Sequence, residues 1–173
     1  MSKDVSKIST KLAVFVFIFA LIGLVLLNLI PCVSVVEKNV IDSGQDFNLH
    51  FNLNMMKKSD NSQIRSLSDD IDIINYGLFT IIIISLLTYL VTIIKLSKES
   101  FDSTKDLLTL GFIMLIVCLS VTFLFFLFIS NVNRIDSIYN SSLLDPIYFM
   151  YIPLVFCLIC ILYCGLYVKI ISN

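Results

Sequence analysis

The chain has 173 residues, of which 58% are hydrophobic and 14% charged, and its formal net charge is -1. Soluble domains hold about 45–50% apolar and about 25% charged residues, so this balance indicates a protein whose solvent is lipid. The near-neutral charge, with no basic patch, excludes a nucleic-acid-binding role.

Four runs without Asp, Glu, Lys or Arg carry the apolar excess: residues 12–30, 73–94, 107–129 and 147–168. Each is close to the roughly 20 residues that a helix needs to cross a bilayer core. Lipid offers no hydrogen-bond partner to the backbone, so helices are expected. The sequence therefore predicts an all-α membrane protein. Residues 1–173 form a single membrane domain, a four-transmembrane-helix bundle with a small extracytoplasmic β-hairpin in the outer loop 31–72.

The orientation of the bundle follows from the basic residues, because short cytoplasmic loops retain positive charge. Seven of the 12 lie in the N-terminal segment, the connection between the second and third runs, and the C-terminal tail: Lys3, Lys7, Lys11, Lys95, Lys98, Lys105 and Lys169. Both termini are expected to be cytoplasmic, with the chain in the cell membrane. The first run is longer than the roughly 7–15-residue core of a signal peptide, so we interpret it as a span.

The outer loop 31–72 begins with two segments typical of strands. Residues 33–40 are rich in β-branched side chains, and Asp42-Ser43-Gly44-Gln45 supplies turn chemistry. Between Asp46 and Asn54, apolar residues alternate with polar ones, which is the period of a half-buried strand. A lone hairpin is marginal in water, so its apolar residues are the candidate interaction surface. These are Phe47, Leu49, Phe51 and Leu53.

Two further features lie on the outer side. Ser59 or Asp60 could cap a short helix along the membrane surface, in which Ile64, Leu67 and Ile71 have helical spacing. The second outer connection is short and polar, and its Asn140-Ser141-Ser142 fits the glycosylation sequon, which makes Asn140 a candidate glycosylation site.

Few residues have the character of a reactive site. Cys157 and Cys160 form a Cys-x-x-Cys, but they lie deep in the fourth run, where a thiol behaves as a small apolar residue. His50 is the only histidine and has no second ligand close in sequence, so no metal site is expected. No run contains a charged residue, which argues against a transporter or pump. Asn28, Asn75 and the stripe Ser85, Thr88 and Thr92 are expected to hold helices together.

The Cys-x-x-Cys within four short spans resembles, in outline, the quinone-linked thiol oxidoreductases of the vitamin K epoxide reductase and disulfide-bond-formation B families. The resemblance implies an active cysteine pair near the outer surface together with loop cysteines. In this sequence only Cys32 lies in an outer segment. A thiol oxidoreductase is therefore the least favoured of three hypotheses for the function.

The order of spans and loops resembles the claudin-type tetraspans, which implies a structural or interaction role. The loop signature of that superfamily contains Trp and a cysteine pair, whereas this chain has no Trp, only Tyr76-Gly77-Leu78-Phe79 at the start of its second span. We therefore expect a non-enzymatic protein without cofactors whose outer loop binds itself or another membrane protein. The alternative is an accessory subunit of a larger membrane transport or secretion complex.

Overall fold

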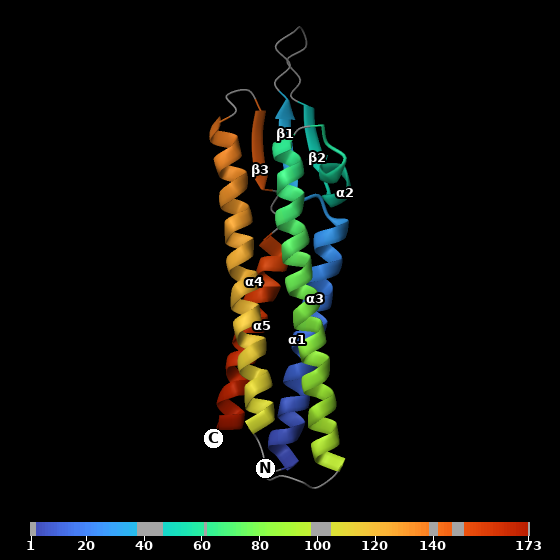
Figure 1. Cartoon of the computed structure of the whole chain (residues 1–173), viewed down its shortest axis with the longest axis vertical. Coiled ribbons are helices and arrows are strands. Elements are labelled where there is room, and N and C mark those ends of the chain that lie inside the picture. The colour runs from blue at the N-terminus through green and yellow to red at the C-terminus, as the bar shows by residue number, and fades with distance from the viewer. Residues whose placement is uncertain are drawn as a thin grey trace.

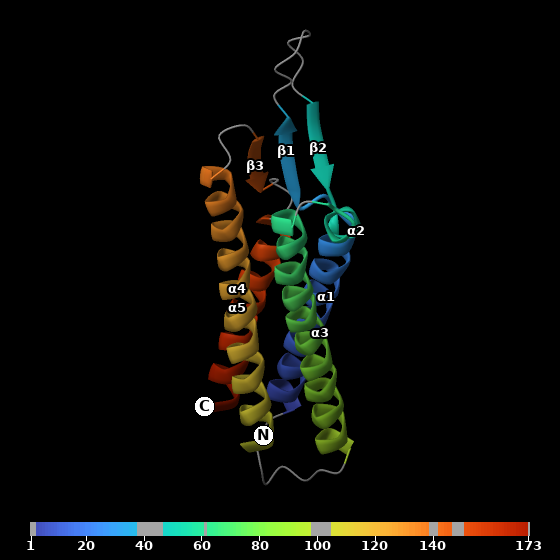
Figure 2. The ribbon, with the colours of Figure 1, turned by 45° about the horizontal axis from the view of Figure 1, so that its top comes forward.

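The computed structural model describes residues 3–37, 47–60, 62–97, 105–138, 142–146 and 151–172. Within these residues, four long helices run side by side: α1 (Lys3–Leu29), α3 (Ser62–Ser97), α4 (Lys105–Ile138) and α5 (Tyr151–Ser172). The short helix α2 (Leu53–Lys57) and the strands β1 (Val33–Glu37), β2 (Phe47–Phe51) and β3 (Ser142–Pro146) gather at one end of the bundle. Figures 1 and 2 show the two chain ends at the opposite end.

Each long helix contains a stretch that is long and apolar enough to cross a membrane. These stretches are Thr10–Leu29, Ser62–Ile94, Asp106–Arg134 and Tyr151–Ser172. The prediction of four apolar helices is confirmed, and their arrangement is compatible with a multi-pass helical bundle.

The four helices surround a large apolar cluster and a second, smaller one formed by Leu12, Leu107, Tyr167 and Ile171. α1 packs against α3 and α5, and α4 packs against the same two helices. Buried positions recur at alternating intervals of three and four residues, which is the heptad spacing of left-handed coiled coils. In α3 the positions with this spacing are Ile64, Leu67, Ile71, Ile74, Leu78, Ile81, Ser85, Thr88 and Thr92, and Ser68, Ile82 and Ile84 are buried beside them. In α4 they are Leu107, Gly111, Met114, Cys118, Val121, Phe125, Phe128 and Val132.

The core combines small residues with large ones such as Phe125 and Phe128, while large apolar residues cover the outside. α1 buries Ala13 and Ala20, and α5 buries Cys157, Cys160 and Cys164. The outer surface carries side chains such as Ile116, Phe123 and Leu162, which are 60%, 61% and 69% exposed. In lipid, burying apolar surface between helices gives no hydrophobic driving force. Small residues favour helix association there because they allow close contact between the helices.

Two helices extend well past their charge-free runs toward the sheet. At 1.5 Å per residue, Ser62 lies about 16 Å along the axis from Ile73, where the charge-free run of α3 begins. The prediction of a separate surface helix is therefore wrong. Ile64, Leu67 and Ile71 continue the heptad pattern of α3 and are buried, because the core extends beyond the charge-free run.

The strands form an antiparallel sheet in the order β2-β1-β3. β1 pairs with β2, Val33 opposite Phe51 and Val35 opposite Leu49, while the predicted turn, within residues 38–46, lies outside the described residues. β3, in the short polar connection for which no strand was predicted, pairs with the other edge of β1. The strand predicted to reach Asn54 ends at Phe51.

Candidate functional site at the sheet end of the bundle

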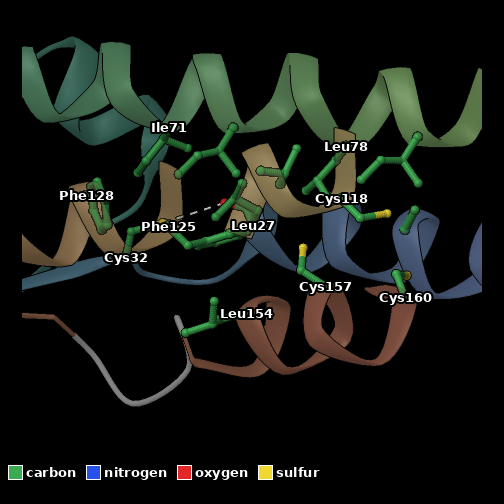
Figure 3. Packing of buried hydrophobic residues seen from close by; sticks show 14 of the residues in the cluster. Leu27, Cys32, Ile71, Leu78, Cys118, Phe125, Phe128, Leu154, Cys157 and Cys160 are labelled. Carbon is green, nitrogen blue, oxygen red and sulfur yellow. Dashed lines mark hydrogen bonds between the residues drawn. The ribbon is translucent and has the colours of Figure 1, made fainter. Parts of the chain in front are cut away.

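The segment between α1 and β1 closes the sheet end of the core. Cys32 and Val33 are both 0% exposed. The Cys32 thiol lies 3.6 Å from the carbonyl oxygen of Leu27, to which it donates, and 3.4 Å from that of Ile30. Figure 3 shows Cys32 in the same cluster as Phe125 of α4. Burial raises the pKa of the Cys32 thiol to about 12, so it stays protonated and packs as an apolar group.

Helix α2 connects the sheet to the bundle. The side chain of Asn52 accepts a hydrogen bond of 3.0 Å from the backbone N–H of Met55, which caps the helix and ends the strand before it. Leu53 is 6% and Met56 0% exposed. The prediction that Leu53 extends the apolar strand face is therefore wrong, because the cap at Asn52 turns the chain and Leu53 enters the core.

Polar contacts between neighbouring elements fix this end of the molecule. Lys57 of α2 lies 2.6 Å from a carboxylate oxygen of Asp72 on α3. On the other side of α3, Asn131 of α4 donates a hydrogen bond of 2.9 Å to Asp70. α2 and α4 are thus both held to the same stretch of α3, just before its charge-free run 73–94.

Asn28 and Asn75 form a reciprocal amide pair between α1 and α3. Asn28 donates to the side-chain oxygen of Asn75 at 3.0 Å, and Asn75 donates back at 3.3 Å. The prediction that these residues hold helices together is confirmed. Because the pair lies just below the sheet, it fixes α1 and α3 where the chain leaves the bundle.

The stripe Ser85, Thr88 and Thr92 lies where the helices pack, as predicted for residues that hold helices together. All three residues are buried in the bundle core. Their hydroxyl groups donate to carbonyl oxygens one turn back on α3 itself, those of Ile82, Ile84 and Thr88. The stripe therefore contributes small size within the chain's own core, and it does not form a polar surface for another subunit.

The remaining candidate interaction residues, Phe47, Leu49 and Phe51, belong to β2. This strand is at an edge of the sheet, since the order β2-β1-β3 leaves one side of β2 without a neighbour among the described strands. β3 forms the opposite edge and contacts α4. The structure thus places three of the four predicted residues together on an edge strand.

The sheet also aligns three residues that are far apart in sequence. Ser34 of β1 has His50 of β2 as its register partner on one side and Asp145 of β3 on the other. A catalytic relay needs histidine between the nucleophile and the carboxylate. Here serine occupies the central strand, so the row does not have the order of a relay. Sequence reasoning missed it because β3 was not predicted.

The four cysteines within the helices are all buried in the core. Cys118 and Cys164 are in contact, with their sulfur atoms 3.9 Å apart, whereas Cys160 faces the carbonyl oxygen of Val16 at 3.8 Å. The two residues of the Cys-x-x-Cys, Cys157 and Cys160, both lie in the buried core of the bundle (Figure 3). This differs from the outward-facing pair of the thiol oxidoreductases that the spacing resembles.

Two further sequence predictions concern a metal site and a glycosylation site. Among the described residues, no group of three or more His, Cys, Asp or Glu side chains could hold a metal ion. Asn140 lies outside the described residues.

Comparison with protein-family models, curated proteins and solved structures finds no match to this chain.

Proposed function

We propose that this chain is a non-enzymatic four-pass protein of the cell membrane, with both termini in the cytoplasm. Its sheet lies on the outer side and associates with a second copy or with another membrane protein. The observation that carries the proposal is the three-stranded sheet fixed to one end of the bundle with β2 at its edge.

The distribution of basic residues supports the orientation. The end opposite the sheet holds both termini and the connection between α3 and α4, where seven of the 12 basic residues lie. An even number of crossings puts both termini on one side, and this end carries the positive charge that cytoplasmic loops retain. The sheet is then outside.

The contacts around the sheet support an interaction role. Residues that join the sheet to the bundle are buried or hydrogen-bonded: Cys32, Leu53 and Met56 in the core, and Lys57 paired with Asp72. Because these contacts already order the edge strand, the strand loses less conformational entropy when a partner binds. Backbone hydrogen bonds along an exposed edge are a common means of adding a partner strand.

Affinity purification of the tagged chain from its native membrane in mild detergent, followed by mass spectrometry, tests the proposal. We expect a partner, or a second differently tagged copy, to be retained by the wild type and lost from the Phe47→Ser, Phe51→Ser double variant. The matched control is Met55→Ser, because Met55 lies on α2 beside the sheet and is 54% exposed. Equal retention by the β2 variant and the control, with unchanged helical content, would refute a role for β2.

A further inference from the structure

We propose that β2 pairs with β2 of a second copy that points in the opposite direction, so that the protein joins two apposed membranes. This rests on the proposed function and names its partner. The result would be a continuous six-stranded antiparallel sheet, in place of the three-stranded sheet of one copy.

The two edges of the sheet differ in their protection. β3 contains Asp145 and ends at Pro146, and charge and proline are the devices that block pairing at a sheet edge. β2 reads Phe47-Asn48-Leu49-His50-Phe51 and contains no Lys, Asp, Glu, Pro or Gly. An edge without such residues is a template for another strand. The sequence therefore directs association to the β2 edge.

The sequence of β2 is also self-complementary. A two-fold axis at Leu49 in an antiparallel pair sets Phe47 opposite Phe51 of the second copy and Asn48 opposite His50. Aromatic residues then face aromatic residues, and no like-charged residues are opposed. A two-fold axis perpendicular to the sheet keeps each face continuous, so Phe47, Leu49 and Phe51 remain on one face in both copies.

The direction of the strands sets the direction of the partner. Figures 1 and 2 show the three strands running along the long axis of the bundle, parallel to the helices. The two-fold axis of an antiparallel pair is perpendicular to its strands, and hence to the bundle axis. The second bundle must therefore point the opposite way. Two copies side by side in one membrane would instead bring parallel β2 strands together with their faces reversed, so Phe47, Leu49 and Phe51 of the two copies would lie on opposite faces, and parallel pairing is also slightly less stable per residue.

Vesicle tethering measures this arrangement directly. The full-length chain is reconstituted into two populations of phosphatidylcholine vesicles, one with donor and one with acceptor lipid dyes, at equal outward-facing density. Wild-type vesicles are expected to tether to wild-type vesicles and not to protein-free ones. Two double variants then test the pairing, Asn48→Lys with His50→Lys and Asn48→Glu with His50→Glu. Both positions lie on the face of the sheet that does not carry Leu49.

We expect tethering to be lost when either charge variant is on both populations and to return when the lysine variant meets the glutamate variant. The matched control is Leu143→Lys with Asp145→Lys, on the same face of the β3 edge, which should leave tethering unchanged. Tethering that survives like charges, or does not return with opposite ones, would overturn the pairing. If wild-type vesicles do not tether but the chain still retains a partner in detergent, the β2 pairing is wrong while the proposed function stands.

Discussion

Gly111 provides a direct test of how closely α4 and α5 pack. A Cβ atom at this position would lie 2.7 Å from Cδ1 and 2.8 Å from Cε1 of Tyr167, and 3.2 Å from Cγ2 of Val168. Tyr167 is 0% exposed, so its ring is enclosed by other parts of the protein. We therefore expect Gly111→Ala to destabilise the bundle although alanine is the better helix former.

The magnitude follows from two opposing effects. Overpacking a close contact costs about 1–3 kcal/mol, while replacing glycine by alanine in a helix gains about 1 kcal/mol. The net loss at Gly111 is then roughly 0–2 kcal/mol. Gly165 is the matched control, because a Cβ atom there would meet no atom within 4 Å, so alanine gains the helix term alone.

The difference in stability between the two variants isolates the overpacking. It should be about 1–3 kcal/mol, which is roughly a 5- to 150-fold change in the ratio of folded to unfolded protein. The assay is reversible unfolding in mild detergent micelles by added sodium dodecyl sulfate, followed by circular dichroism. Equal stabilities of Gly111→Ala and Gly165→Ala would refute the close contact between α4 and Tyr167.

Two further predictions concern the sheet end of the bundle. A double-mutant cycle of Asn28→Leu and Asn75→Leu, measured by the same unfolding assay, should give a coupling energy of about 0.6–1.7 kcal/mol, because each amide serves as the other's partner; additive effects would contradict the pair. The pKa of Cys32 is raised from 9.0 to about 12 by burial. The unfolded state therefore releases this proton first, and the free energy of unfolding should fall between these values by up to about 1.4 kcal/mol per pH unit. Comparison with Cys32→Val at about pH 8 and about pH 10 checks this, and identical slopes would exclude a buried thiol.

The sequence contained more information about the core than its apolar runs revealed. Nearly every position in the four runs is hydrophobic, so hydrophobic periodicity cannot distinguish the buried face of a helix from its lipid face. Residue size separates the two faces only in part: Ala13 and Ala20 are buried and Phe123 and Leu162 are exposed, yet Phe125 is buried as well. Cys157, Cys160 and Cys164 are small and buried, which explains their one-sided spacing as helix packing.

Two local signals conflict at the end of the strand. Asn52 is a good helix cap, yet it continues the alternation of polar and apolar residues that precedes it. The alternation predicts a strand through Leu53, and the cap predicts a helix after Asn52. The helix forms because Leu53 and Met56 can enter the core from α2, and this benefit depends on residues distant in sequence.

By itself the sequence determined the four apolar helices, because a backbone in lipid must satisfy its own hydrogen bonds and about 20 apolar residues do this only as a helix. It also determined which segments carry most of the basic residues, namely the two termini and the connection between the second and third apolar runs. The tertiary structure alone decided that α3 continues to Ser62, that β3 joins the sheet, and that β2 becomes its edge. Strand order and helix extension depend on contacts between segments far apart in the chain, and local composition carries no information about which segments meet.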